Sequence, residues 1–80
     1  MSGQKLYISY CNDRHIDPVI NVFTDKDKAI EFTRSFMNEH MAYPDGIEEI
    51  LVKGYILNLI YNYAEDNAFV IEAILDEPSN

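Results

Sequence analysis

Few residues of this 80-residue chain have the chemistry of a catalytic site. Cys11, His15 and Asp17 bring a thiol, an imidazole and a carboxylate close together in the sequence, which are the residue types of an activated nucleophile. The segment lacks a recognised nucleophile turn, and Asp13, His15 and Asp17 also fit a simple solvated loop. The three glycines are isolated and form no phosphate-binding loop. We therefore predict a protein that is not an enzyme, and keep a small-ligand site near His15 and Cys11 as a third interpretation.

Metal binding is not predicted either. Cys11 and His15 are four positions apart and His40 is the one further soft ligand, whereas a structural zinc site needs four converging ligands. Asp25-Lys26-Asp27 imitates the start of a calcium-binding loop, but Ile30 stands where that loop needs glycine. We expect no metal and no other cofactor.

The charge of the chain is strongly acidic and unevenly distributed. Its 14 acidic and 6 basic residues give a net charge of −8. Residues 1–36 are neutral overall, so the whole excess lies in residues 37–80. Such a surface repels nucleic acid and attracts a basic protein partner. The alternative is an acidic surface that serves only solubility. The acidic residues predicted to bind the partner are Glu39, Asp45, Glu48, Glu49, Glu65, Asp66, Glu72 and Asp76.

Tyrosine is abundant, with six residues and no tryptophan. Tyr55, Tyr61 and Tyr63 alternate along one predicted strand and would share one of its faces. Aromatic side chains on an exposed sheet face often serve recognition, although tyrosine also simply favours strands. We predict that these three tyrosines belong to the protein-binding surface.

Two hairpins and a helix are expected to position these side chains. Residues 5–23 predict an N-terminal hairpin, because the side chains of its strands alternate between two faces. Residues 54–76 predict a second hairpin around a polar turn. Residues 25–40 predict a helix with Thr24 as its N-cap. Its apolar stripe consists of Ala29, Phe32, Thr33, Phe36, Met37 and His40.

The remaining segments predict a break and a tail. Within residues 41–53, Pro44-Asp45-Gly46 marks the break. Asp45 followed by Glu48 favours a short helix through Ile47, Ile50 and Leu51, and a strand through Leu51 and Val52 is the rival interpretation. Residues 77–80 are expected to form a tail. The predicted fold is one α+β domain: a four-stranded, mainly antiparallel sheet in the order ββαββ, with one amphipathic helix on one face and a short second helix.

Cellular location follows from what the chain lacks. Cys11 is alone, so an internal disulfide is excluded. The N-terminus has no signal-peptide core, and no apolar run approaches the ~18–20 residues of a membrane span. We expect a soluble, cytoplasmic protein with no membrane partner.

The run Val22–Phe32 is similar to the strand-to-helix junction of many small phage proteins. With its small size, acidity, ββαββ layout and lack of catalytic motifs, the chain resembles small phage-encoded inhibitors of the anti-CRISPR and antirestriction type. This resemblance implies a viral protein in the host cytoplasm that blocks a defence protein, often at a nucleic-acid groove and sometimes as a DNA mimic. The expected function is thus inhibition of a basic, nucleic-acid-handling protein by an acidic surface. The alternative is a small structural or regulatory homodimer that pairs through its sheet.

Overall fold

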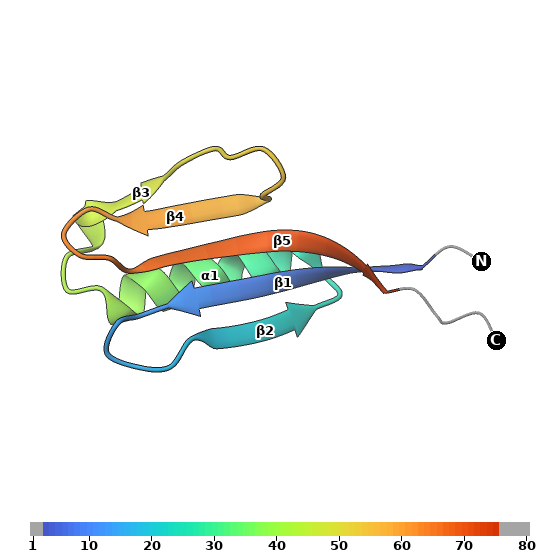
Figure 1. Ribbon diagram of the computed structural model, residues 1–80, viewed down its shortest axis with the longest axis horizontal. Coiled ribbons are helices and arrows are strands. Elements are labelled where there is room, and N and C mark those ends of the chain that lie inside the picture. Colours follow the sequence, from blue (N-terminus) through green and yellow to red (C-terminus); the bar gives the residue numbers. More distant parts are fainter. Residues whose placement is uncertain (1–2, 76–80) are drawn as a thin grey trace.

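The computed structural model describes residues 3–75, which form one α-helix packed on a five-stranded antiparallel sheet (Figure 1). The strand order is β2-β1-β5-β4-β3, so the first and last strands in sequence lie side by side at the centre. The elements are β1 (Gln4–Asn12), β2 (Val19–Phe23), α1 (Lys26–His40), the 3₁₀ turn η1 (Pro44–Gly46), β3 (Ile47–Glu49), β4 (Leu57–Tyr61) and β5 (Asn67–Leu75). The predicted α+β class is confirmed, but the predicted number of four strands is wrong because β3 adds a fifth.

The short helix predicted after α1 is also wrong. Residues 44–46 form only the turn η1, and Ile47–Glu49 then pair with β4 in an antiparallel register. This pairing satisfies the backbone groups on the outer edge of β4, which a helix at the same place would leave open. The rival strand through Leu51 and Val52 is not formed either. Both residues are exposed and lie in the loop 50–56.

Helix α1 begins with a cap one residue later than predicted. The carboxylate of Asp25, not the hydroxyl of Thr24, accepts hydrogen bonds from the backbone N–H groups of Asp27 at 2.9 Å and Lys28 at 3.2 Å. A carboxylate at this position satisfies two helix-end donors and also places negative charge at the positive end of the helix dipole. The helix itself and its C-terminal end at His40 are confirmed.

The core lies between α1 and one face of the sheet. Strand side chains alternate between faces, and the pairs Ser9↔Val70 and Cys11↔Ala68 point toward the helix. The hydroxyls of Ser9 and Thr33 lie 2.6 Å apart in this core and link the helix to β1. The helix contributes its predicted stripe, except that His40 is exposed and Phe32 only half-buried; the buried members are Ala29, Thr33, Phe36 and Met37.

The other face of the sheet is left open. Figure 1 shows α1 behind β1 and β5, with the near face uncovered by any other described element. At its centre the rings of Tyr10 and Phe69 stack with centroids 5.0 Å apart, and Tyr55 packs edge-on against Phe69 at 5.1 Å. Within residues 3–75, no helix is long and apolar enough to cross a membrane.

Candidate functional site

Three connections meet at one end of the sheet: the β1–β2 loop, the segment after α1, and the β4–β5 turn. A pocket of about 210 Å³ opens between them. Its polar and aromatic lining comes from Arg14, His15, His40, Tyr43, Tyr61, Tyr63 and Asp66. This end therefore brings together both histidines of the chain and three of its six tyrosines.

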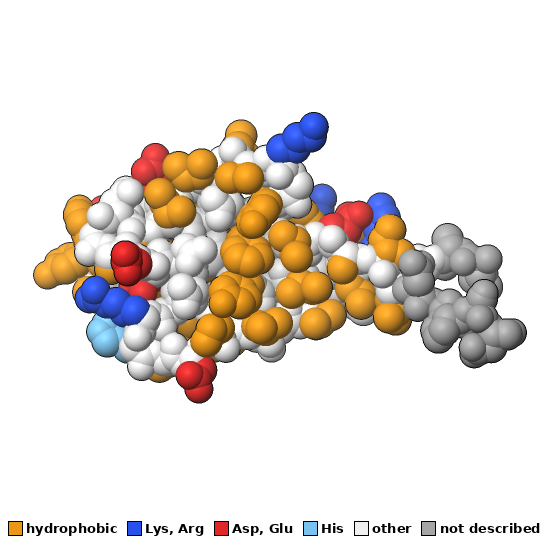
Figure 2. Space-filling view, viewed as in Figure 1, with side chains coloured by type: hydrophobic (Ala, Val, Ile, Leu, Met, Phe, Trp, Pro, Cys, Tyr) orange, Lys and Arg blue, Asp and Glu red, His pale blue; other side chains and the backbone are white. Residues whose placement is uncertain are grey.

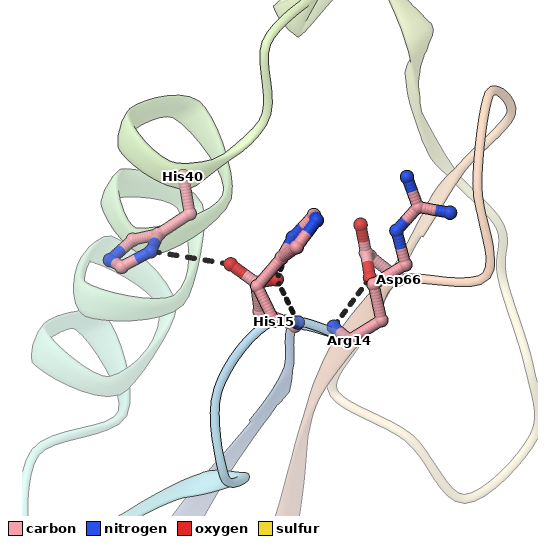
Figure 3. Close-up of polar contacts among 5 residues, drawn as sticks. Arg14, His15, His40 and Asp66 are labelled. Atoms are coloured by element: carbon pink, nitrogen blue, oxygen red, sulfur yellow. Dashed lines mark hydrogen bonds and ion pairs between the residues drawn. The ribbon is translucent and has the colours of Figure 1, made fainter.

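Asp13 is the buried anchor of the β1–β2 loop. Its Oδ1 accepts the backbone N–H of His15 at 2.9 Å, and Nδ1 of the same histidine lies 3.1 Å away. Its Oδ2 lies 3.5 Å from Nδ1 of His40 at the end of α1 (Figure 3). The hydrogen bond from the His15 backbone lowers the pKa of Asp13, and this outweighs the opposite effect of burial. An ionised Asp13 thus ties the loop to the end of the helix, a role that sequence reasoning missed when it took the residue for a solvated one.

Asp66 stabilises the neighbouring β4–β5 turn. Its side chain is buried, and its Oδ1 accepts the backbone N–H of Arg14 at 2.8 Å (Figure 3). Its backbone carbonyl accepts the N–H of Tyr61 at 3.1 Å and closes the β4–β5 turn. Sequence reasoning placed Asp66 among the partner-binding acids, but its carboxylate is directed at the backbone of the protein itself.

The three predicted tyrosines do not share one face. Tyr61 is buried on the helix side, because it alternates with Leu57 and Leu59 along β4. Tyr63 follows the strand in the turn, where the alternation no longer applies. Tyr55 precedes β4 and packs against the open face instead.

An additional tyrosine joins Tyr61 and Tyr63 at the pocket. Tyr43 donates its backbone N–H to the hydroxyl of Tyr61 at 3.1 Å, and its ring meets that of Tyr63 edge-on at 5.8 Å. Tyr43 and Tyr63 are each 65% exposed. Gly46 permits this arrangement, since a Cβ there would come within 2.6 Å of the Tyr63 ring. In the sequence, only the turn indicated by the next residue, Pro44, could have drawn attention to Tyr43 as a site residue.

Some of the predicted acids lie beside these tyrosines. Asp45 in η1, Glu48 in β3 and Glu65 in the turn are all exposed. Their segments are connected, because Asn62 donates its backbone N–H to the carbonyl of Gly46 at 2.8 Å and its side chain to Glu48 at 3.2 Å. The structure therefore places three acids from separate segments at one end of the molecule.

The other predicted acids are placed differently. Glu39 is exposed in the last turn of α1. Glu49 forms an ion pair of 2.8 Å with Arg34, which neutralises its charge. Glu72 is exposed on β5, about 17 Å along the strand from the turn at Asn67. Asp76 lies outside the described residues.

Cys11 and His15 do not form a joint site. The thiol of Cys11 is fully buried under α1, 3.6 Å from the hydroxyl of Ser9, and does not line the pocket. Burial raises its pKa and keeps the thiol in its unreactive neutral form. Among the side chains of residues 3–75, no three His, Cys, Asp or Glu residues are grouped so that they could hold a metal ion.

Comparison with known proteins adds no relative: no protein-family model, no curated protein and no solved structure matches the chain.

Proposed function

We propose that this protein is a non-enzymatic inhibitor that binds another protein through its pocket end. The contact surface, called here the recognition end, consists of Tyr43, Asp45, Glu48, Tyr63 and Glu65. The observation that supports it is the pair of exposed tyrosines, which meet edge-on beside Gly46 and have three exposed acids in the adjoining segments. Tyrosine gives a large contact area at a small cost in side-chain entropy and is enriched among the residues that dominate binding energy.

The charge of the recognition end favours a basic partner. Residues 37–80 carry the whole acidic excess of the chain, and such a surface accelerates encounter with a positively charged protein. Arg14, His15 and His40 also line the pocket. We therefore propose that the contact is made by η1, β3 and the β4–β5 turn, where Asp45, Glu48 and Glu65 are exposed. We propose a nucleic-acid-handling protein as partner, blocked at its basic groove, with a phage-encoded anti-defence role as the biological setting.

Charge reversal at the recognition end tests this proposal. The variant Glu48→Lys/Glu65→Lys changes two exposed acids and leaves the buried Asp66 intact. We expect it to fold like the wild type but to lose the partner, because two attractive charges become repulsive at the contact. The matched control is Glu31→Lys/Glu72→Lys, which makes the same change in net charge at exposed positions away from this end.

The assay is affinity capture of the tagged chain from a lysate of its natural host, at about 50 mM and about 500 mM salt. The expected partner is basic, is captured by the wild type and by the control, and is released at the higher salt. Addition of the chain to that purified partner should then displace its bound nucleic acid. Equal capture by all three proteins would rule out the acidic contact, and equal loss from both variants would show that only net charge matters.

A further inference from the structure

The open face of the sheet is a second surface, which adjoins the recognition end only at Glu48 on the outermost strand β3. Figure 2 shows hydrophobic side chains gathered across this face over β1, β5 and the neighbouring strands. Two of them on the edge strand β2, Ile20 and Val22, are 60% and 59% exposed. The apolar side chains that the register places on the face are Leu6, Ile8, Tyr10, Ile20, Val22, Ile60, Phe69, Ile71, Ala73 and Leu75.

This face carries no charge within the described residues of β2, β1, β5 and β4. Its polar side chains are uncharged and lie at its margins, as in the amide pair Asn12–Asn67 at 3.3 Å and in Asn58 on β4. The first acid on this side is Glu48, on the outermost strand β3. A basic partner would find no charge to complement here, whereas a second copy would bring a matching apolar and uncharged surface.

A two-fold arrangement of two copies is possible on this face. The central pair of the β1–β5 ladder is Ile8↔Ile71, with Leu6↔Ala73 on one side and Tyr10↔Phe69 on the other. A two-fold axis through this central pair would place the open face of one copy on the same patch of the other. Such isologous contacts are the commonest in homodimers, and two sheets pack face to face at about 10 Å.

The size of the face can be compared with the area that a stable dimer needs. Its strands of nine, nine, five and five residues cover a flat footprint of roughly 450 Å². The accessible surface is larger because every side chain stands up from the sheet, which brings it toward the about 800 Å² per partner of a stable interface. That area is about one seventh of the 5733 Å² surface of the chain.

We infer that the protein pairs with a second copy of itself through the open face. The dimer is a four-layer sandwich with two sheets inside and one helix on each outside. It buries the exposed isoleucine, valine and aromatic side chains that a monomer leaves in water, and it enlarges the thin core of an 80-residue domain. Of each recognition end, only Glu48 on the outermost strand β3 shares this side of the sheet, at the margin of the contact.

Sedimentation equilibrium of the full chain from about 1 to 500 μM tests the inference, over a range in which interfaces of this size associate. The wild type is expected at twice its 9.3 kDa mass. Val22→Glu on β2 and Asn58→Glu on β4 place a charge at opposite margins of the face. Each should weaken dimerisation at least roughly 100-fold, because the carboxylate would be buried without a partner. The control Leu51→Glu changes a loop residue that is 91% exposed, and it should dimerise like the wild type.

Circular dichroism of each variant verifies that its monomer is folded. A wild type that stays monomeric over the whole range would overturn the inference and assign the face to a different protein. A dimer weakened by Val22→Glu alone would also overturn it, since pairing would then run along the β2 edge. If the Val22→Glu variant does not fold, Ile20→Glu takes its place on the same strand. A monomeric wild type, or a dimer weakened by this β2 variant alone, would then overturn the inference.

Discussion

The role of Asp13 predicts a measurable, pH-dependent loss of stability in the variant Asp13→Asn. The amide keeps an oxygen that can accept the His15 backbone N–H, but it loses the negative charge. A hydrogen bond to a charged group contributes about 1.5–3 kcal/mol and a neutral one about 1 kcal/mol. The two histidine contacts add less, because the His15 and His40 side chains are 73% and 41% exposed and such pairs are worth about 0–1 kcal/mol.

These contributions predict that Asp13→Asn lowers the free energy of unfolding by about 1–2 kcal/mol at neutral pH. For a domain of this size, that corresponds to a fall in Tm of roughly 5–15 °C. Thermal and urea unfolding followed by circular dichroism measure the change. Both proteins must be compared at one protein concentration, because dimerisation makes Tm depend on concentration. Asp17→Asn, an exposed carboxylate in the same loop, is the matched control and should change stability by less than about 0.5 kcal/mol.

The pH dependence follows from the lowered pKa of Asp13. In the unfolded chain its pKa is near the ordinary 3.8, and in the folded protein it is lower. The stabilisation is therefore complete above the unfolded value and is lost as the pH falls through the folded value. The gap between wild type and Asp13→Asn should close in that acidic window, since the wild-type carboxyl becomes neutral too. Equal stability of the two proteins at pH 7, or a gap that persists after Asp13 is protonated, would refute the reasoning.

Two further predictions concern the tyrosines and the thiol. Gly46→Ala should displace the Tyr63 ring, which lies 2.6 Å from the new Cβ, and lower stability by about 1 kcal/mol. It should also weaken partner capture; an unchanged near-ultraviolet tyrosine signal with full capture would contradict this. Cys11 should stay unmodified by excess maleimide in the folded protein and react fully in denaturant, as measured by mass spectrometry, because its thiol is completely buried. Rapid labelling without denaturant would show that the β1–α1 packing is wrong.

Local patterns in the sequence were sufficient for the helix and the two hairpins. Alternation along residues 5–23 and spacings of three and four along residues 25–40 depend only on neighbours in the chain, so they can be recognised without a structure. The short strand β3 could not be recognised in this way. Its three residues have no alternation to detect, and they become a strand only because β4 offers them an open edge.

The candidate surfaces, too, could be predicted from the sequence only in part. Acidity, the abundance of tyrosine and a helix on one face of a sheet were evident from residue types and their order. Tertiary structure decided which side chains are available: the packing of two loops buries Asp13 and Asp66, and the turn at Gly46 brings Tyr43 beside Tyr63. Burial and proximity between distant segments depend on how the elements pack, and no pattern among sequence neighbours records that packing. For the same reason, the uncharged open face became evident only when the register of β2, β1, β5 and β4 was known.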